Sequence, residues 1–297
     1  MISRKFIIWA CGLLFVFSSC AEDMVKPIEN DKDAPGTVQD VKTESLPGAV
    51  KFTYTLPSDP DLLYVLAKYT NKTGKVMEFR SSFYTNSVTV EGFGDTDTYK
   101  VELYTVDRSE NRSQPQIVEV APLTPPILSC YESLSVVSDF GGMTFEMDNK
   151  FKSDLAIYVC TPDELGDMVL AETFYSAREE IVYSVRGYDA VPRRFGIFLQ
   201  DKYGNETDTL FTELTPIYER ELDKTKFREM YLQNDSRVDS YDGKMEYVWN
   251  GRISKDGDSG GVGLHTGTGT KDGPAVFTFD LGVLAKLSRF ALWAIQD

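Results

Sequence analysis

The sequence predicts an all-β protein made of tandem β-sandwiches, and three observations lead to this fold class. Apolar residues alternate with polar ones along short segments, which is the pattern of a strand with one buried face. Clusters of Pro, Gly, Asn and Asp separate these segments about every 8–12 residues, which is typical of a sandwich or barrel. Several short phrases recur after 94 or 95 residues, a distance that suits one sandwich module and exceeds the period of a solenoid repeat.

The first module is expected between residues 35 and 122. Its clearest strand contains Val50, Phe52, Tyr54 and Leu56, which alternate with lysine and threonine. That period of two places the four apolar side chains on one face of a sheet. Further strands are expected at 62–69, 76–79, 88–90, 99–106 and 117–120.

The second module is expected at residues 123–216, because parts of the first module recur there. The recurring phrases are 90–93 as 185–188, then Asp107, Asn111 and Ser113 as Asp201, Asn205 and Thr207, and finally 123–125 as 214–216. Strands are expected at 127–130, 155–160 and 195–199. The repeat predicts that both modules share one fold.

The first module resembles a fibronectin type III domain. Tyr99 begins its penultimate strand and Phe93 lies six residues earlier, which is the arrangement of the tyrosine corner. The segment 107–113 resembles the polar turn between the last two strands of that domain. In the second module Arg193 occupies the place of the tyrosine, so no such corner is expected there. The resemblance implies a role in spacing and presentation, and none of these residues suggests catalysis.

Residues 1–20 have the features of a lipoprotein signal peptide. Two basic residues precede a twelve-residue apolar run at 6–17, which is shorter than the roughly 20 residues of a membrane span but suits a signal sequence. The Ser-Ser-Cys sequence that ends at Cys20 resembles the lipobox of bacterial lipoproteins. The resemblance implies that Cys20 carries lipid and anchors the chain to a membrane. An ordinary cleaved signal peptide with an incidental cysteine is the alternative.

Residues 21–34 are polar and aperiodic, so we expect a flexible tether. The acidic residues just after Cys20 resemble the signal that exports some lipoproteins to the outer face of the outer membrane. The expected location is therefore the outer membrane, lipid-anchored, at the cell surface. The alternative is a soluble linker without an export signal.

The charge balance excludes one class of partner. The chain has 46 acidic and 31 basic residues, a net charge of −15. Cleavage before Cys20 removes two basic residues, which leaves 29 against 46, or −17. Because nucleic-acid binding depends on basic patches, no nucleic-acid partner is expected.

No catalytic residue is expected. The sequence 257–261 has the spelling found around the nucleophile of chymotrypsin-like proteases, but that mechanism needs a histidine far upstream. The single histidine, His265, lies six residues downstream of Ser259. A surface loop is the better interpretation. Carboxylate pairs at glycosidase spacing arise by chance among 46 acids, so an accessory glycosidase remains an alternative.

Residues 217–297 differ from the two modules. A short helix is expected within 218–235. A Gly-rich loop is expected at 256–273, followed by strands at 276–282 and 287–295. The phrases 246–252 and 277–282 resemble the N-terminal part of a discoidin-like, galactose-binding-like jelly roll, so the jelly roll is expected to be incomplete. The resemblance implies sugar-binding loops, with Tyr247, Trp249, Arg252 and His265 as the candidate ligand-binding residues. For Trp249, packing in the core is favoured over ligand binding.

Metal and disulfide chemistry are expected to be sparse. Asn250 stands where the discoidin pattern has an aspartate, which weakens the case for calcium there, although a structural calcium ion in this domain stays open. No other cofactor is expected. Cys130 and Cys160 are interpreted as two buried thiols rather than a disulfide, because their strands are expected in opposite sheets.

The whole layout resembles surface lipoproteins encoded with starch-utilisation-type glycan-uptake systems, which carry a lipobox, two sandwich domains of unknown function and a discoidin-like domain. The resemblance implies a non-enzymatic protein that captures glycan at the cell surface. Two alternatives stay open besides this one. The protein is then either a scaffold that binds envelope proteins and no sugar, or an accessory glycosidase subunit.

Overall fold

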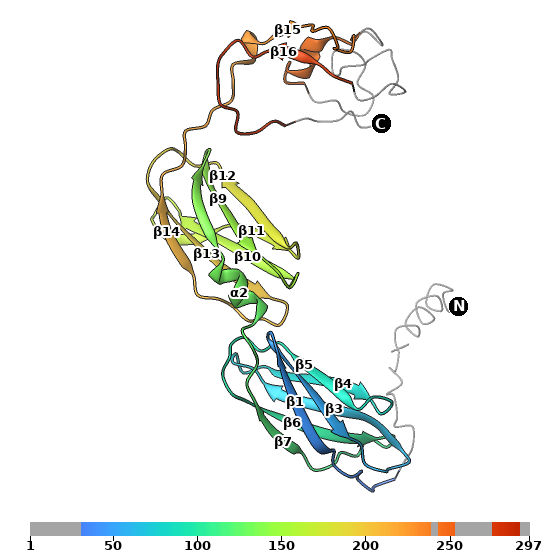
Figure 1. The fold of residues 1–297 in the computed structure, drawn as a ribbon. Helices are drawn as coiled ribbons and strands as arrows, with labels where there is room; N and C mark the ends of the chain where they lie inside the picture. The colour runs from blue at the N-terminus through green and yellow to red at the C-terminus, as the bar shows by residue number, and fades with distance from the viewer. Residues whose placement is uncertain (1–30, 239–242, 253–274, 292–297) are drawn as a thin grey trace, which may run out of the picture.

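The computed structural model describes residues 31–238, 243–252 and 275–291 (Figure 1). It shows two β-sandwiches in succession, followed by a third part with little regular structure. The predicted all-β class, with tandem fibronectin-III-like sandwiches, is confirmed. Within these described ranges, the chain forms no helix that is both long and apolar enough to cross a membrane.

The first sandwich packs a sheet of order β1-β2-β5 against a sheet of order β4-β3-β6-β7, with antiparallel neighbours throughout. The bounds are β1 Gln39–Leu46, β2 Ala49–Thr55, β3 Leu62–Thr70, β4 Val76–Ser82, β5 Ser87–Glu91, β6 Tyr99–Asp107 and β7 Gln116–Val120. β1 was not expected from the sequence. As an edge strand with mostly exposed side chains, it lacks the apolar alternation that marks its neighbours.

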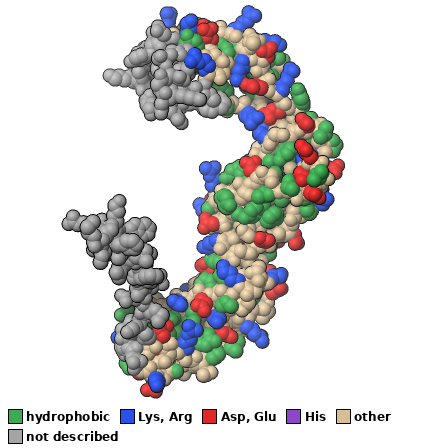
Figure 2. Space-filling view, turned by 180° about the vertical axis from the view of Figure 1, so that it is seen from behind, with side chains coloured by type: hydrophobic (Ala, Val, Ile, Leu, Met, Phe, Trp, Pro, Cys, Tyr) green, Lys and Arg blue, Asp and Glu red, His purple; other side chains and the backbone are tan. Residues whose placement is uncertain are grey.

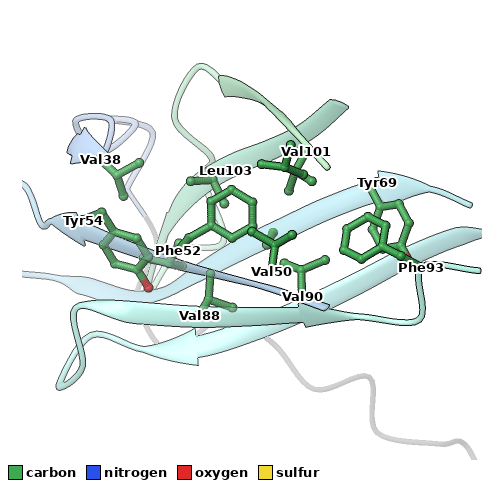
Figure 3. Close-up of a cluster of buried hydrophobic side chains, with 13 residues drawn as sticks. Val38, Val50, Phe52, Tyr54, Tyr69, Val88, Val90, Phe93, Val101 and Leu103 are labelled. Carbon is green, nitrogen blue, oxygen red and sulfur yellow. The ribbon is translucent and has the colours of Figure 1, made fainter. Parts of the chain in front are cut away.

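The core of this sandwich lies between its two sheets (Figure 3). Val50 and Phe52 of β2 are fully buried, whereas Lys51 between them is only partly buried. The predicted alternation along this strand therefore describes its two faces. The ring of Tyr69 stacks on that of Phe93 with centroids 4.4 Å apart. Each such large side chain contributes about 1.5–3 kcal/mol to the stability of the fold.

The second sandwich repeats the three-plus-four arrangement, with sheets of order β12-β9-β8 and β11-β10-β13-β14. The bounds are β8 Ser135–Asp139, β9 Gly142–Asp148, β10 Leu155–Pro162, β11 Met168–Ser176, β12 Glu180–Arg186, β13 Arg193–Asp201 and β14 Leu210–Leu214. Its core contains Phe145, Ile157 and Phe195, all fully buried. The strands expected at 155–160 and 195–199 are the central β10 and β13.

The strand expected at 127–130 is wrong, because these residues lie in helix α2, Pro126–Glu132. Pro126 is in the first turn of the helix, where the fixed φ of proline suits the helix and its missing N–H is not needed. Ile127 and Cys130 then share one face of the helix and pack on the core of the second sandwich. The apolar residues thus lie on one face of a short helix rather than on a strand.

Both cysteines of the second sandwich are free thiols in the described structure. Cys130 on α2 is buried, and its Sγ lies 3.5 Å from the side-chain oxygen of Asn149. Burial raises the pKa of the Cys130 thiol to about 11. Cys160 on β10 is half-buried, and burial raises its pKa as well. Both thiols are therefore protonated and poorly nucleophilic near neutral pH.

The third part has short elements only. They are the 3₁₀ helices η1 Lys224–Lys226 and η2 Met245–Val248, and the antiparallel pair β15 Arg228–Met230 and β16 Thr278–Asp280. The helix expected within 218–235 is reduced to η1, and the described residues of 287–295 contain no strand. Leu287 and Phe290 are 57% and 70% exposed, so no facing sheet covers them. The discoidin-like assignment of 217–297 stays a prediction.

The recurring Asp and Asn residues form the same polar turn in both sandwiches. In the first, Oδ1 of Asp107 accepts the N–H groups of Ser109 and Asn111, both at 2.8 Å, and Oδ2 accepts the amide of Asn111 at 2.9 Å. Asp201 and Asn205 repeat this pattern at 2.8–2.9 Å. The turn joins the last two strands of each sandwich, so the repeat in the sequence is a repeat of hydrogen bonds.

We expect Asp107→Ala to destabilise the first sandwich strongly, because Asp107 is fully buried and its removal leaves three donors without their acceptor. The loss in free energy of unfolding should be about 2–4 kcal/mol, measured by urea denaturation. Asp97→Ala, in an exposed loop, is the matched control and should change it by less than about 0.5 kcal/mol. Equal effects of the two substitutions would contradict this account of the turn.

Candidate functional site

The two sandwiches meet where the polar turn of the second contacts the end of the first. The amide of Asn205 donates to the backbone oxygen of Gly92 at 3.2 Å, and the Tyr203 hydroxyl donates to the carboxylate of Glu91. Burial and the Glu91 charge both raise the pKa of Tyr203, so this hydroxyl keeps its proton. Gly92 has φ +84°, and a Cβ there would lie 2.9 Å from the Tyr203 ring. The contact therefore needs glycine at this position.

The chain between the sandwiches is also fixed. Leu123 forms a parallel bridge with Pro47, and its backbone oxygen accepts the N–H of Gly48 at 3.0 Å. The N–H of Leu123 donates to Leu46 at 3.0 Å. Helix α2 begins three residues later at Pro126. Hydrogen bonds therefore fasten the first junction at both the linker and the turn.

The far end of the second sandwich holds the third part in the same way. Ile217 pairs with Phe140, its N–H donates to the Asp139 oxygen at 2.9 Å, and its own oxygen accepts the N–H of Gly141 at 2.7 Å. Arg186 occupies the position that Glu91 has in the repeat. The bonds to Ile217 thus repeat those to Leu123.

Arg186 lies at the centre of this second junction. Its guanidinium donates to the carboxylate of Asp139 at 2.7 Å and lies 3.6 Å from that of Glu219. Glu219 also accepts from the Ser288 hydroxyl at 2.5 Å and lies 3.3 Å from the Nε of Arg289. The side chains of Arg186, Asp139 and Glu219 are at most 24% exposed. Arg186 of the second sandwich therefore contacts Glu219, and Glu219 in turn binds a separate segment of the third part through Ser288 and Arg289.

Asp139 carries a shifted pKa at this junction. Burial by itself raises the pKa, but hydrogen bonds from the Thr144 hydroxyl and the Phe140 N–H, with the charge of Arg186, outweigh it and hold the pKa of Asp139 below its ordinary value. A carboxylate with a lowered pKa stabilises the fold above its unfolded pKa. That stability is lost as the pH falls through the folded pKa, in the acidic range below about 4.

We expect Arg186→Ala to loosen the third part while leaving both sandwiches folded. Hydrogen exchange at Ile217 should become about tenfold faster at neutral pH, equivalent to about 1.4 kcal/mol, since Asp139 loses its cation and Glu219 keeps only Arg289. In the wild-type protein the same loosening should appear only as Asp139 is protonated in acid. The matched control is Arg178→Ala, at an exposed position outside the junction, which should leave exchange at Ile217 unchanged. Unchanged protection in Arg186→Ala would refute this role of the cation.

The structure places Trp249 in a small aromatic cluster of the third part. Its ring lies 5.8 Å from that of Phe227 and 5.2 Å from that of Phe279, between centroids. The side chain is half-buried. Trp249 therefore ties the segment after η2 to the strand β16. Its role in ligand binding stays a prediction.

The other candidate residues of the third part are less constrained. Tyr247 on η2 is half-buried, with the amino group of Lys244 5.9 Å from its ring centroid. Arg252 is exposed, and its N–H donates to the side chain of Asn250 at 2.9 Å, which closes a turn. The structure thus brings Tyr247, Trp249 and Arg252 together in one short segment. His265 and Cys20 lie outside the described residues.

One group of acidic side chains in the described ranges has metal-like spacing. Oxygens of Asp31, Asp61 and Asp107 lie within 4.8 Å of one another in the first sandwich. The carboxylate of Asp107 already accepts three hydrogen bonds of its turn, and Asp31 accepts one from Asn111 at 3.0 Å. The group therefore serves to hold the end of the tether on the first sandwich. This group lies in the first sandwich, so it has no bearing on the calcium site considered for the third part.

The tyrosine corner has a different partner from the expected one. The hydroxyl of Tyr99 donates to the carboxylate of Asp95 at 2.7 Å instead of the backbone, and burial with the Asp95 charge raises the pKa of Tyr99. In the second sandwich Arg193 lies over the ring of Tyr188, 4.7 Å from its centroid. A cation–π contact thus takes the place of the ring contact between Phe93 and Tyr99, whose centroids lie 4.9 Å apart in the first sandwich.

Sequence analysis missed the junction residues Glu91, Tyr203 and Arg186. The signal that indicates two of them is the repeated phrase itself, in which Glu91 and Arg186 are the one pair with opposite charge. Both face a junction. A change of charge inside an otherwise similar repeat was therefore the available sign of a contact with the neighbouring unit.

Comparisons with known proteins agree with two tandem sandwiches. Residues 35–122 match the model of a domain of unknown function, DUF4959, and residues 123–225 match that of another, DUF5126. The chain therefore combines two domains of unknown function, each with a fibronectin-III-like fold. No curated protein matches the chain.

Three solved structures are similar to parts of this chain. A SusE-like protein is 30% identical over 55% of this chain, with a TM-score of 0.34, and the match spans 57% of that protein. A segment of two fibronectin type III domains from chicken tenascin is 12% identical over 60% of this chain and 99% of its own length, with a TM-score of 0.29. The chicken interferon gamma receptor alpha chain is 10% identical over 62% and 100%, with a TM-score of 0.24.

Proposed function

We propose that the protein is a non-enzymatic, lipid-anchored protein of the bacterial outer surface, in which two sandwiches hold a glycan-binding third part away from the membrane. The observation that carries this proposal is the fixed joint at both ends of the second sandwich. Hydrogen bonds and ion pairs replace flexible linkers there. A spacer needs this property, because flexible joints would let the third part fold back onto the membrane.

The direction of the spacer supports the proposal. The three parts follow one another, with the third part beyond the second sandwich at the end away from the first sandwich (Figure 1). The proposed lipid on Cys20 and the tether at 21–34 precede the first sandwich. Asp31, near the end of that tether, bonds to the turn of the first sandwich through Ser109 and Asn111.

We expect Cys20→Ala to abolish membrane anchoring. In detergent phase separation the wild-type protein should enter the detergent phase, because two or three acyl chains contribute about 0.8 kcal/mol for each buried CH₂. The variant should stay in the aqueous phase. Cys11→Ala is the matched control and should partition like the wild type. A Cys20→Ala protein that still enters the detergent phase would show that another segment is the anchor.

We expect the purified chain without residues 1–19 to bind defined sugars on a glycan array, with Arg252 contributing because it is exposed beside the Trp249 cluster. Arg252→Ala should weaken binding at least tenfold by calorimetry, whereas the exposed Arg220→Ala should not. No hydrolysis of chromogenic glycosides is expected. Co-purification with an envelope protein and no sugar binding would favour the scaffold alternative instead. Turnover of any glycoside would reject the non-enzymatic assignment.

A further inference from the structure

The outer face of the second sandwich has a groove that none of the functions above uses. The groove has a volume of about 630 Å³ and lies on the sheet β11-β10-β13-β14, on the side away from the core. Figure 2 shows hydrophobic side chains gathered on the second sandwich. The groove is lined by residues that include Asp154, Ala156, Tyr158, Tyr175, Gln200 and Lys202.

The strand register explains why a hollow forms at this place. Ala156 of β10 pairs with Tyr175 of β11 on one side and with Gln200 of β13 on the other. A small side chain therefore lies between two long ones, and forms the floor of the groove. In the adjacent row Tyr158 stacks on Phe198, with ring centroids 4.7 Å apart and an angle of 12° between the rings. Tyr158 of that pair lines the groove and forms one wall.

The opposite wall is an aromatic ring that is open to solvent. Tyr175 is 75% exposed and lies near the end of β11, the edge strand of this sheet. Aromatic rings bury 150–250 Å² in typical packing, so an uncovered ring offers a large apolar surface to a ligand. The apolar C–H face of a pyranose ring fits such a surface. The polar groups beside the ring select the ligand.

The polar groups of the groove are held in position and have bonding capacity left. The Tyr158 hydroxyl donates to Oε1 of Gln200 at 3.2 Å, and Nε2 of Gln200 donates to Glu206 at 2.7 Å. A glutamine amide has two donors and two acceptor sites. One of each is used, so Gln200 presents one donor and one acceptor in a fixed orientation. Adjacent hydroxyls of a sugar supply the complementary pair.

The groove continues into the cleft between the two sandwiches. A cavity of about 320 Å³ at that junction shares Asp154, Asp201 and Lys202 with the groove. It adds Phe151, a further ring that is 50% exposed, and two separate charged side chains, Glu91 and Lys152. Together the two hollows provide room for more than one sugar ring.

The charge of the combined hollow excludes strongly charged ligands. Its acidic side chains are Glu91, Asp154 and Asp201, and its basic ones are Lys152 and Lys202. Three acids against two lysines give a nearly balanced lining in a chain whose net charge is −15. A polyanion or a polycation finds no complementary field there. Few-point polar recognition beside apolar surface remains, which is the character of a small-ligand site.

We propose that this groove, continued by the inter-sandwich cleft, binds a neutral oligosaccharide, with one ring against Tyr175 and its hydroxyls on Gln200. The site belongs to the second sandwich and its junction with the first. It does not depend on the third part, so it is separate from the sugar binding proposed there. A chain with both sites would hold a glycan at two points, which raises the effective concentration of the second contact.

The test is affinity electrophoresis of the chain without residues 1–19 in native gels that contain amylopectin, a mixed-linkage β-glucan, xylan, galactomannan or no polysaccharide. At least one polysaccharide should retard the wild-type protein. Tyr175→Ala and Gln200→Ala should each weaken that retention at least tenfold, with calorimetry on the matching oligosaccharide as the second measurement. Tyr84→Ala removes an 84% exposed ring of the first sandwich and should bind like the wild type. Thermal melting of each variant checks that it is folded.

Comparison with Arg252→Ala separates this inference from the proposed function. If Tyr175→Ala and Gln200→Ala lose retention and folded Arg252→Ala keeps it, the result supports the sugar site in the groove. The same result contradicts the sugar binding proposed for the third part. The reverse result overturns the groove and leaves the proposed function intact. Loss in both sets supports two sites. The groove is also overturned if none of the four polysaccharides retards the wild-type protein.

Discussion

The amide of Asn205 is the group on which the arrangement of the two sandwiches depends. One of its N–H groups donates to Asp201 and folds the polar turn, and the other reaches Gly92 of the first sandwich. The side chain is almost completely buried, so neither N–H has water as a substitute partner. Both N–H groups therefore have a partner only when the turn is folded and the two sandwiches are joined. A sandwich whose turn is formed is also a sandwich ready to dock.

The parts of the fold that the sequence predicts well are those where one face of a strand is buried. Val50 and Phe52 indicate β2 because the core requires an apolar side chain at every second position. β1 escapes notice because an edge strand is held by backbone hydrogen bonds, for which side-chain pattern carries no signal. Helix α2 is mistaken for a strand because its seven residues are too few to reveal the helical period. The Pro125-Pro126 pair was the better indicator.

The candidate sites divide along the same line. Tyr247, Trp249 and Arg252 are neighbours in the sequence, so a motif finds them together without knowledge of the fold. The groove of the second sandwich joins Tyr175, Ala156 and Gln200 from three strands, and only the register of β11, β10 and β13 makes them neighbours. Along each strand these residues look like ordinary outward positions. A site whose residues come from several strands therefore cannot be predicted from the strand positions alone, because it depends on how the strands pair.

The contrast between Glu91 and Arg186 has a consequence for how such a chain is assembled. Each sandwich has a receiving end, with the position of Glu91 or Arg186 on it, and an inserting end formed by the Asp and Asn turn. The receiving end of the first sandwich accepts a tyrosine hydroxyl, and that of the second accepts the carboxylate of Glu219. Two sandwiches of one architecture thus use different contact residues at the same end. The side chain at this one repeated position, Glu91 or Arg186, therefore determines which unit can follow each sandwich. An exchange of the two sandwiches would break both joints while leaving each fold intact.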